Sequence, residues 1–146
     1  MHGGAGESSL ARLTPHWPAA AHAWPVITTP TNSATRVVLV ARSHAAGLRA
    51  AQRAATQWAS FATPEPVQVL GLVVVADAPG RLPRPLRELV DLVGGGVPHT
   101  WFVPWIESWR LGESPTLQAA PRPVASVIDA ITALLPPAHR PTSSTR

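Results

Sequence analysis

Two largely apolar runs rich in valine constrain the fold of this chain more than any other feature. They are RVVLVA at 36–41 and VQVLGLVVVA at 67–76. A strand with one face in water alternates apolar and polar residues, whereas a strand covered on both faces is apolar throughout. Both runs therefore predict strands buried on both faces, as in a parallel sheet. A shorter run at 99–103 predicts a third strand, which Pro104 ends.

Helical patterns separate and follow these runs. Segment 44–61 repeats apolar residues at helical spacing, and Ser43 precedes it as the expected N-cap. Segment 83–93 predicts a second helix, ended by the three glycines at 94–96, and 124–135 predicts a closing helix. Strands that alternate with helices predict an α/β fold, a small three-layer parallel-sheet domain with right-handed crossovers.

Length and composition predict one soluble domain. The chain of 146 residues is long enough to bury a core. We expect a single domain over 1–135, with a long proline-rich loop at 14–35, and a disordered tail at 136–146. The sequence has no signal-peptide pattern, no apolar run long enough to span a bilayer and no cysteine. These features predict a cytoplasmic protein without a membrane partner or a disulfide framework.

The positive charge of the chain comes from arginine alone. All 12 basic side chains are arginine, and the formal net charge is +4. Without lysine, tyrosine or cysteine, no side chain titrates between histidine and arginine, so the basic isoelectric point does not indicate a nucleic-acid ligand. The absence of lysine also excludes a Schiff base and a lysine clamp on a terminal phosphate.

The glycine cluster HGGAGESSL at 2–10 has the composition of a phosphate-binding loop. In such a loop glycines allow close approach, successive backbone amides converge on an anion, and a lysine and a hydroxyl complete the site. The cluster resembles the deviant Walker A loop of the ParA/MinD class of P-loop ATPases. The matching positions are Gly3, Gly4, Ala5, Gly6, Ser8 and Ser9, while His2 and Glu7 stand at the two lysines.

The resemblance implies a P-loop NTPase-like fold and ATP or another nucleotide, with Mg²⁺, as ligands. The chain also resembles a group of uncharacterised actinobacterial proteins with a loop of the HGGAGEST type, over most of 2–113. Glu7 departs from the pattern, because a carboxylate repels the triphosphate that the lysine would hold. We therefore expect a module that does not hydrolyse nucleotide.

Two further departures concern the surroundings of the loop. Only Met1 precedes it, so we expect the first strand of the P-loop fold to be missing. No apolar strand ending in aspartate lies between the loop and Val37, so the Walker B element is also expected to be absent. A glycine turn that caps a helix without any ligand stays open as the alternative.

Three tryptophans mark the end of the third predicted strand. Trp101, Trp105 and Trp109 lie in WFVPWIESW, where open α/β sheets usually bind ligands. In the ParA/MinD class this loop helps to hold the adenine, so the resemblance implies that Trp105 stacks on a base. The favoured alternative is packing, because a four-residue spacing puts Trp105 and Trp109 on one side of a helical turn, as core or as a partner-binding patch.

Other polar residues are weaker candidates. Asp77 in VVVADAPG follows a strand, where a carboxylate could lie beside Mg²⁺, but a turn is favoured. Arg81, Arg84 and Arg87 form a positive edge for a phosphate, although a solvated face with Arg84 paired to Glu88 is favoured. The scattered histidines predict no metal site, and no catalytic residue is predicted.

Three functions follow as hypotheses. The first is a degenerate, non-hydrolysing P-loop-like module that binds a nucleotide or phosphate and serves regulation or partner binding, linked to plasmid-partition or conjugative-element machinery. The second is a protein-interaction domain without nucleotide that uses the patch of Trp101, Trp105 and Trp109. The third is an ATPase with unusual catalytic residues, which the loop chemistry disfavours.

Overall fold

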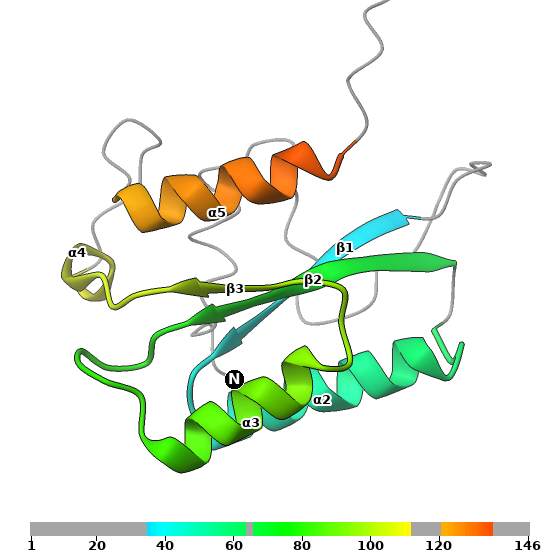
Figure 1. Ribbon diagram of the computed structural model, residues 1–146, viewed down its shortest axis with the longest axis horizontal. Coiled ribbons are helices and arrows are strands. Elements are labelled where there is room, and N and C mark those ends of the chain that lie inside the picture. The colour runs from blue at the N-terminus through cyan, green and yellow to red at the C-terminus, as the bar shows by residue number, and fades with distance from the viewer. Residues whose placement is uncertain (1–34, 64–65, 112–120, 136–146) are drawn as a thin grey trace, which may run out of the picture.

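The computed structural model describes residues 35–63, 66–111 and 121–135 of the chain. Within these ranges three strands alternate with helices (Figure 1). In chain order the elements are β1 (Thr35–Arg42), α2 (Ala45–Ala59), β2 (Val67–Val75), α3 (Arg84–Gly94), β3 (Thr100–Val103), α4 (Glu107–Arg110) and α5 (Arg122–Ala133). The predicted α/β order is confirmed. The glycine cluster, the tail and the 14–35 loop, apart from Thr35, lie outside the described residues.

The three strands form one parallel sheet in the order β1-β2-β3. Leu39 pairs with Leu72, and Val74 pairs with Phe102. The register between β1 and β2 shifts once, between Val37 and Val38, so that one extra residue of β2 is accommodated there. β2 is therefore the central strand of the described sheet.

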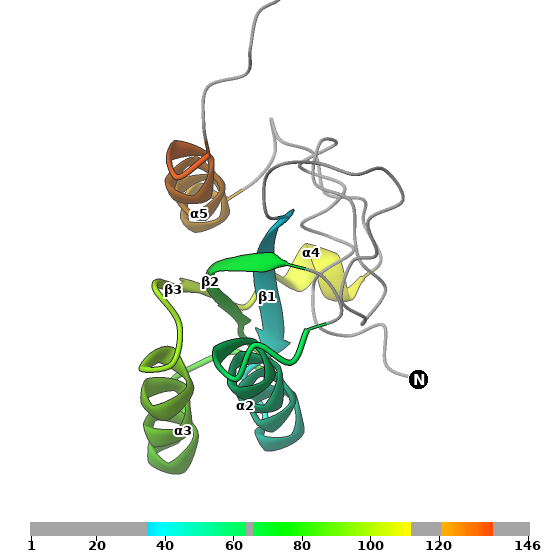
Figure 2. The same ribbon diagram turned by 90° about the vertical axis from the view of Figure 1, so that its right-hand side faces the viewer.

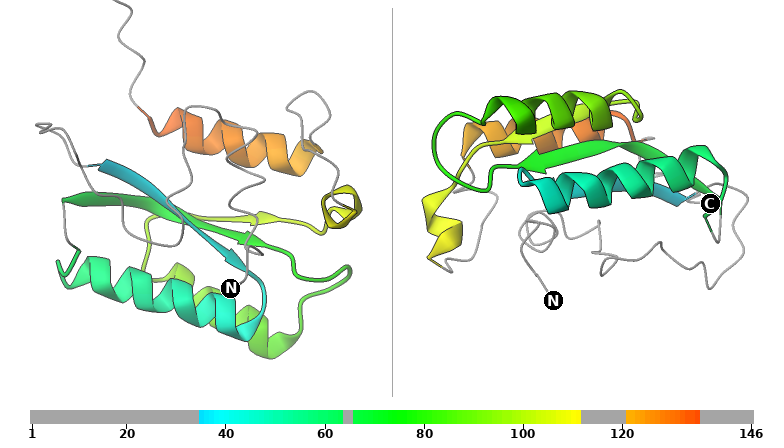
Figure 3. Two further views of the ribbon diagram at one scale, coloured as in Figure 1. Left: turned by 180° about the vertical axis from the view of Figure 1, so that it is seen from behind. Right: turned by 90° about the horizontal axis from the view of Figure 1, so that it is seen from below.

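Helices cover both faces of the sheet. α2 and α3 lie on one face and α5 lies on the other (Figures 1 and 2). Seen from below, α2 and α3 lie side by side along the sheet (Figure 3). Successive crossovers of the same hand place their helices on the same face, as these two do. The predicted three-layer arrangement is confirmed for the described residues.

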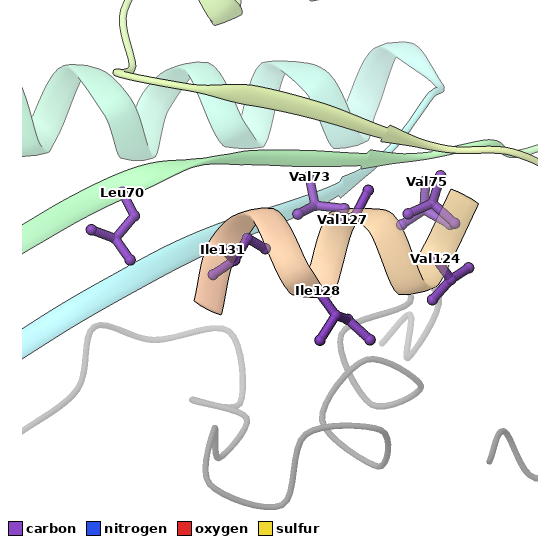
Figure 4. Packing of buried hydrophobic residues seen from close by; sticks show 8 residues of the cluster. Leu70, Val73, Val75, Val124, Val127, Ile128 and Ile131 are labelled. Atoms are coloured by element: carbon purple, nitrogen blue, oxygen red, sulfur yellow. The ribbon is translucent and has the colours of Figure 1, made fainter. Parts of the chain in front are cut away.

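The two faces of β2 belong to two different hydrophobic clusters, which explains its uninterrupted apolar sequence. Leu72 and Val74 pack towards α2 and α3, in what we call the α2/α3 cluster. Val73 and Val75 pack towards α5, in what we call the α5 cluster. Figure 4 shows the second cluster, in which β2 meets the valines and isoleucines of α5. Because side chains alternate along a strand, only a strand covered on both sides buries successive residues as β2 does from Val69 to Val75.

β1 is less buried than its sequence predicts. Val38 and Val40 pack partly against the α5 cluster, and Leu39 packs partly against the α2/α3 cluster, but only Ala41 of this strand is buried. The prediction of full burial on both faces is therefore wrong for β1, because it lies at the edge of the described sheet, where less of its surface is covered.

The N-cap of α2 is His44, not Ser43 as the sequence predicts. The His44 ring accepts a hydrogen bond at Nδ1 from the backbone N–H of Gly47, at 2.9 Å. Such a bond satisfies one of the amides that a helix start leaves without an intrahelical partner. Ser43 is buried instead, and its hydroxyl accepts from the Asp77 backbone N–H at 2.9 Å. A contact between residues 34 positions apart overrides the local capping preference.

We expect His44→Ala to lower the free energy of unfolding by about 1 kcal/mol, because the Gly47 amide loses its acceptor. His44→Asn supplies an oxygen that can cap the same turn and is the matched control. Urea unfolding followed by far-UV circular dichroism measures both. Equal stability of the alanine and asparagine variants would contradict a capping role.

Prolines mark where α3 and α5 begin. α3 begins after Pro83 with Pro85 in its first turn, and α5 begins after Pro121 in the same way. Proline is tolerated there because the first amides of a helix have no intrahelical partner. For this reason α5 begins two residues before the predicted range. None of the helices in the described ranges has both the length and the apolar character needed to cross a membrane.

Candidate functional site

All three strands of the sheet end at the same edge, at the left of Figure 1. Backbone hydrogen bonds continue just beyond the strand ends and hold these exits together. The N–H of Ser43 donates to the Val75 carbonyl at 3.0 Å, and the N–H of Ala76 donates to the Val103 carbonyl at 2.8 Å. Ligands of open α/β sheets bind at this carboxyl edge, so it is the first place to look for a site.

A hollow of about 310 Å³ lies at this edge. Its lining comes from the ends of β1 and β2 and from the segment that follows β3. The lining residues are Arg42, Val75, Ala76, Pro104, Trp105, Ile106 and Trp109. The hollow thus combines apolar and aromatic surface with one basic side chain, a composition that is typical of small-molecule sites.

Arg42 is the basic residue of the hollow. Its Nε is fully buried and has no hydrogen-bond partner among the described residues. A buried donor without an acceptor costs free energy, since its bond to water is lost and not replaced. A guanidinium offers up to five donors in a planar fork that fits the oxygens of a phosphate or carboxylate. Arg42 therefore brings a positive charge to the lining of the hollow.

Two of the three tryptophans line the hollow. The Trp105 indole Nε1 donates to the Glu107 carboxylate at 2.7 Å, which fixes the ring beside the site. Trp109 also packs partly against the α5 cluster. Trp101 does not reach the hollow. It packs against the same cluster and stacks on the His99 ring, with centroids 5.6 Å apart.

The prediction that one helical turn carries both Trp105 and Trp109 is wrong, because the helix is shorter than expected. α4 spans only Glu107–Arg110, and Ile106 before it has extended backbone, with φ −125° and ψ 105°. Trp105 therefore lies outside the helix. The two rings meet at the hollow because the chain turns there, and not because they share a helix face. Of the two residues in the packing interpretation, Trp109 does contact the core, and Trp101 contacts it too.

A match to a protein family covers most of the chain, and this edge of the sheet lies within it. Residues 1–128 match DUF6668, a family of unknown function. The chain belongs to this family. No curated protein and no solved structure matches the chain. The match with DUF6668 spans the glycine cluster and every residue that lines the hollow.

The loop residues predicted to bind a phosphate lie within the DUF6668 match but outside the residues that the structure describes. They are Gly3, Gly4, Ala5, Gly6, Ser8 and Ser9. Their role stays a prediction from the resemblance. Of the predicted binding residues, Trp105 alone falls within the described ranges, and it lies at the hollow.

Asp77 forms part of a turn in this DUF6668 chain, as the favoured interpretation predicts. Its side chain is exposed, and its backbone N–H donates to the Ser43 hydroxyl. Gly80 has φ +90°, a conformation that side chains rarely adopt, and completes the exit from β2. The hydrogen bond between Ser43 and Asp77 joins the exits of β1 and β2.

The arginines before and within the first turn of α3 form a solvated face, as predicted. The Arg84 Nε donates to the Glu88 carboxylate at 3.0 Å, with side chains 81% and 65% exposed, and Arg81 and Arg87 are exposed too. Exposed pairs of this kind contribute little to stability. Among the described residues, no three histidine, aspartate or glutamate side chains gather as a possible metal site.

Arg42 was not predicted from the sequence as a site residue. It follows the apolar run of β1 directly and precedes a helix, a position that falls at the carboxyl edge of a parallel sheet. This position is the feature of the sequence from which Arg42 could have been predicted as a site residue. The rest of the lining that faces Arg42 comes largely from Pro104, Trp105, Ile106 and Trp109, which lie in a distant part of the chain.

Proposed function

We propose that this protein is a non-hydrolysing nucleotide- or phosphate-binding module with a regulatory or partner-binding role. One observation carries the proposal. The hollow at the carboxyl edge combines two tryptophans with an arginine whose buried Nε lacks an acceptor. Aromatic walls suit a flat base, and a guanidinium suits a phosphate.

The glycine cluster supports the same proposal from the sequence. Gly3, Gly4 and Gly6 have the spacing of a deviant Walker A loop, and Ser8 and Ser9 supply its hydroxyls. The parallel sheet with helices on both faces is compatible with a P-loop NTPase-like fold, which is part of the proposal. We also propose a cytoplasmic location, in keeping with a sequence that lacks cysteine.

The charged residues of the sequence support binding without hydrolysis. Glu7 replaces the lysine that would hold the terminal phosphate, and no lysine elsewhere in the sequence can take over that task. Glu107 accepts a hydrogen bond from Trp105, which lines the hollow. Negative groups do not stabilise the charge that develops during phosphoryl transfer.

Isothermal titration with ATP, ADP and inorganic phosphate, each with and without Mg²⁺, tests the proposal. We expect saturable heat with a nucleotide at micromolar to millimolar concentration and no release of phosphate from ATP. Arg87→Gln is the matched control, because it removes an exposed arginine of α3 that does not line the hollow, and it is expected to bind equally well. The absence of heat with every ligand at millimolar concentration would remove the proposal.

A nucleotide-free interaction domain remains the competing function. It requires the patch of Trp101, Trp105 and Trp109 to face a partner, but Trp101 and Trp109 are partly buried against the α5 cluster. Gly4→Val separates the two functions. A crowded loop should weaken nucleotide binding under the first function and change nothing under the second.

A further inference from the structure

We infer that copies of this chain associate head to tail, with the Phe61 side chain of one copy seated in the hollow of the next. The inference goes beyond the proposed function and does not rest on it. Its basis is an exposed aromatic side chain at one edge of the sheet and an aromatic hollow at the other edge.

Phe61 is the most exposed large apolar side chain among the described residues, at 94%. An exposed ring of this size loses the free energy that burial of apolar surface would provide. A partner that covers the ring would recover it. Exposed apolar surface of this kind therefore points to a contact with another molecule.

The backbone at Phe61 also disfavours a phenylalanine. Its φ is 55°, and among the described residues no other non-glycine residue has a positive φ. The Phe61 N–H donates to the Trp58 carbonyl at 3.0 Å, and the Ala62 N–H donates to the Gln57 carbonyl at 3.0 Å. These two bonds form the Schellman pattern at the end of α2, in which glycine usually takes the place of Phe61. Neither the helix end nor the solvent accounts for a large aromatic side chain here.

Phe61 and the hollow lie at opposite edges of the sheet. α2 returns from the carboxyl edge and ends beside the start of β2, where the Trp58 indole donates to the Val67 carbonyl at 3.0 Å (Figure 1). β2 then runs for nine residues, about 30 Å, to reach the hollow at Val75. Because one side chain cannot span that length, the hollow can receive Phe61 only from another copy.

The hollow suits a phenyl ring in size and lining. Its volume is about 310 Å³, whereas a cavity of about 150 Å³ is enough for benzene. Trp105 and Trp109 line it together with Pro104 and Ile106, and aromatic rings pack favourably against one another. The bond of 2.7 Å from Trp105 to Glu107 holds one indole in place before the ring arrives, so less conformational freedom is lost on binding.

A second copy is the partner that meets both features at once. Each copy offers a ring at one edge and a hollow at the other, so every copy inside an assembly has its ring covered and its hollow filled. A contact between two different surfaces generates rings or open filaments and not a two-fold dimer. The contact is small, since one aromatic side chain buries only about 150–250 Å². We therefore expect association at high protein concentration.

Sedimentation velocity of the full chain without nucleotide, over about a hundredfold range of concentration, tests the inference. We expect the average mass to rise with concentration beyond that of a dimer. Phe61→Asn should weaken association at least about tenfold, as loss of a central aromatic anchor does. It should also keep or raise the urea midpoint, because asparagine tolerates this φ. Leu92→Gln, which removes an apolar side chain that is 63% exposed on α3, is the control and should associate like the original chain.

A mixture of two variants tests whether the ring and the hollow meet each other. Phe61→Asn keeps the hollow, and Trp105→Ala keeps the ring but loses a wall of the hollow. Each variant alone is expected to stay monomeric. An equimolar mixture should form pairs and nothing larger, because only one competent contact remains in each pair. If Trp105→Ala fails to fold, Pro104→Asp places a charge in the lining and serves the same purpose.

Three results would overturn the inference. They are a chain that stays monomeric at every concentration, association that is unchanged in Phe61→Asn, and a mixture of the two variants that stays monomeric. The last would mean that a surface other than the hollow receives the ring. The nucleotide titration of the proposed function is a separate measurement, so either idea can fail while the other stands.

Discussion

Replacing Gly71 with alanine is expected to lower the free energy of unfolding by about 2–3 kcal/mol. A Cβ at this position of β2 would collide with the His99 carbonyl oxygen and come within 2.6 Å of the Trp101 ring. The His99 carbonyl cannot easily withdraw, because it accepts a hydrogen bond from the Leu72 N–H at 2.9 Å. Relief of the collision would therefore disturb the pairing of β2 with the start of β3.

Gly95→Ala is the matched control for this prediction. Gly95 has helical backbone with φ −66°, and an added Cβ there meets its nearest atom at 3.5 Å, an ordinary contact. We expect this variant to keep or slightly raise the stability, since alanine restricts the unfolded chain. Urea unfolding by tryptophan fluorescence measures both. A Gly71→Ala midpoint equal to that of the original chain would show that the strands are not packed as closely as described.

Arg42→Met is expected to raise the free energy of unfolding by about 1 kcal/mol while it abolishes anion binding. The fold bears the cost of a buried Nε without an acceptor, and methionine removes that donor but keeps an apolar stem of similar reach. The same change takes away the guanidinium that the proposed ligand needs. If Arg42 served the structure alone, Arg42→Met would lower the free energy of unfolding instead of raising it.

Arg36→Met is the control, because it removes the same charge from an exposed position on β1. It is expected to leave both the urea midpoint and nucleotide affinity close to their original values. A clear loss of stability in Arg42→Met would show that this arginine is well satisfied in the folded chain. Retained nucleotide binding in Arg42→Met would instead show that Arg42 does not bind the nucleotide. Ligand binding would then not explain why the fold keeps an arginine that lowers its stability.

The strands could be predicted because their signal is local. The run at 67–76 is apolar from Val69 onward, and this part of β2 is indeed buried against helices on both faces. The N-cap of α2 could not be predicted in this way. Ser43 has the preferred side chain for a cap, but its hydroxyl is engaged by the Asp77 amide on the neighbouring strand exit. Only the three-dimensional pairing of β1 with β2 brings these two residues together.

The candidate site could be predicted only in its location. Parallel strands end at one edge, so Trp105 was expected near a ligand position, and it does line the hollow. The role of Arg42 depends on its distance from Trp105 and Trp109, which lie more than sixty positions further along the chain. No periodicity or motif records such a contact. The stacking of Trp105 on a base stays a prediction.

The strand order has a consequence for how the chain acquires its fold. Because β1, β2 and β3 are neighbours in the same order in space as in sequence, each new strand adds to an existing edge and none has to insert between two others. Each pairing joins residues about thirty positions apart across one helix, as Thr35 with Val67, and parallel pairing over such a separation is slow to form. The sheet can still grow from the amino-terminal side while the chain leaves the ribosome. Val73 and Val75 then stay uncovered until α5 has been synthesised.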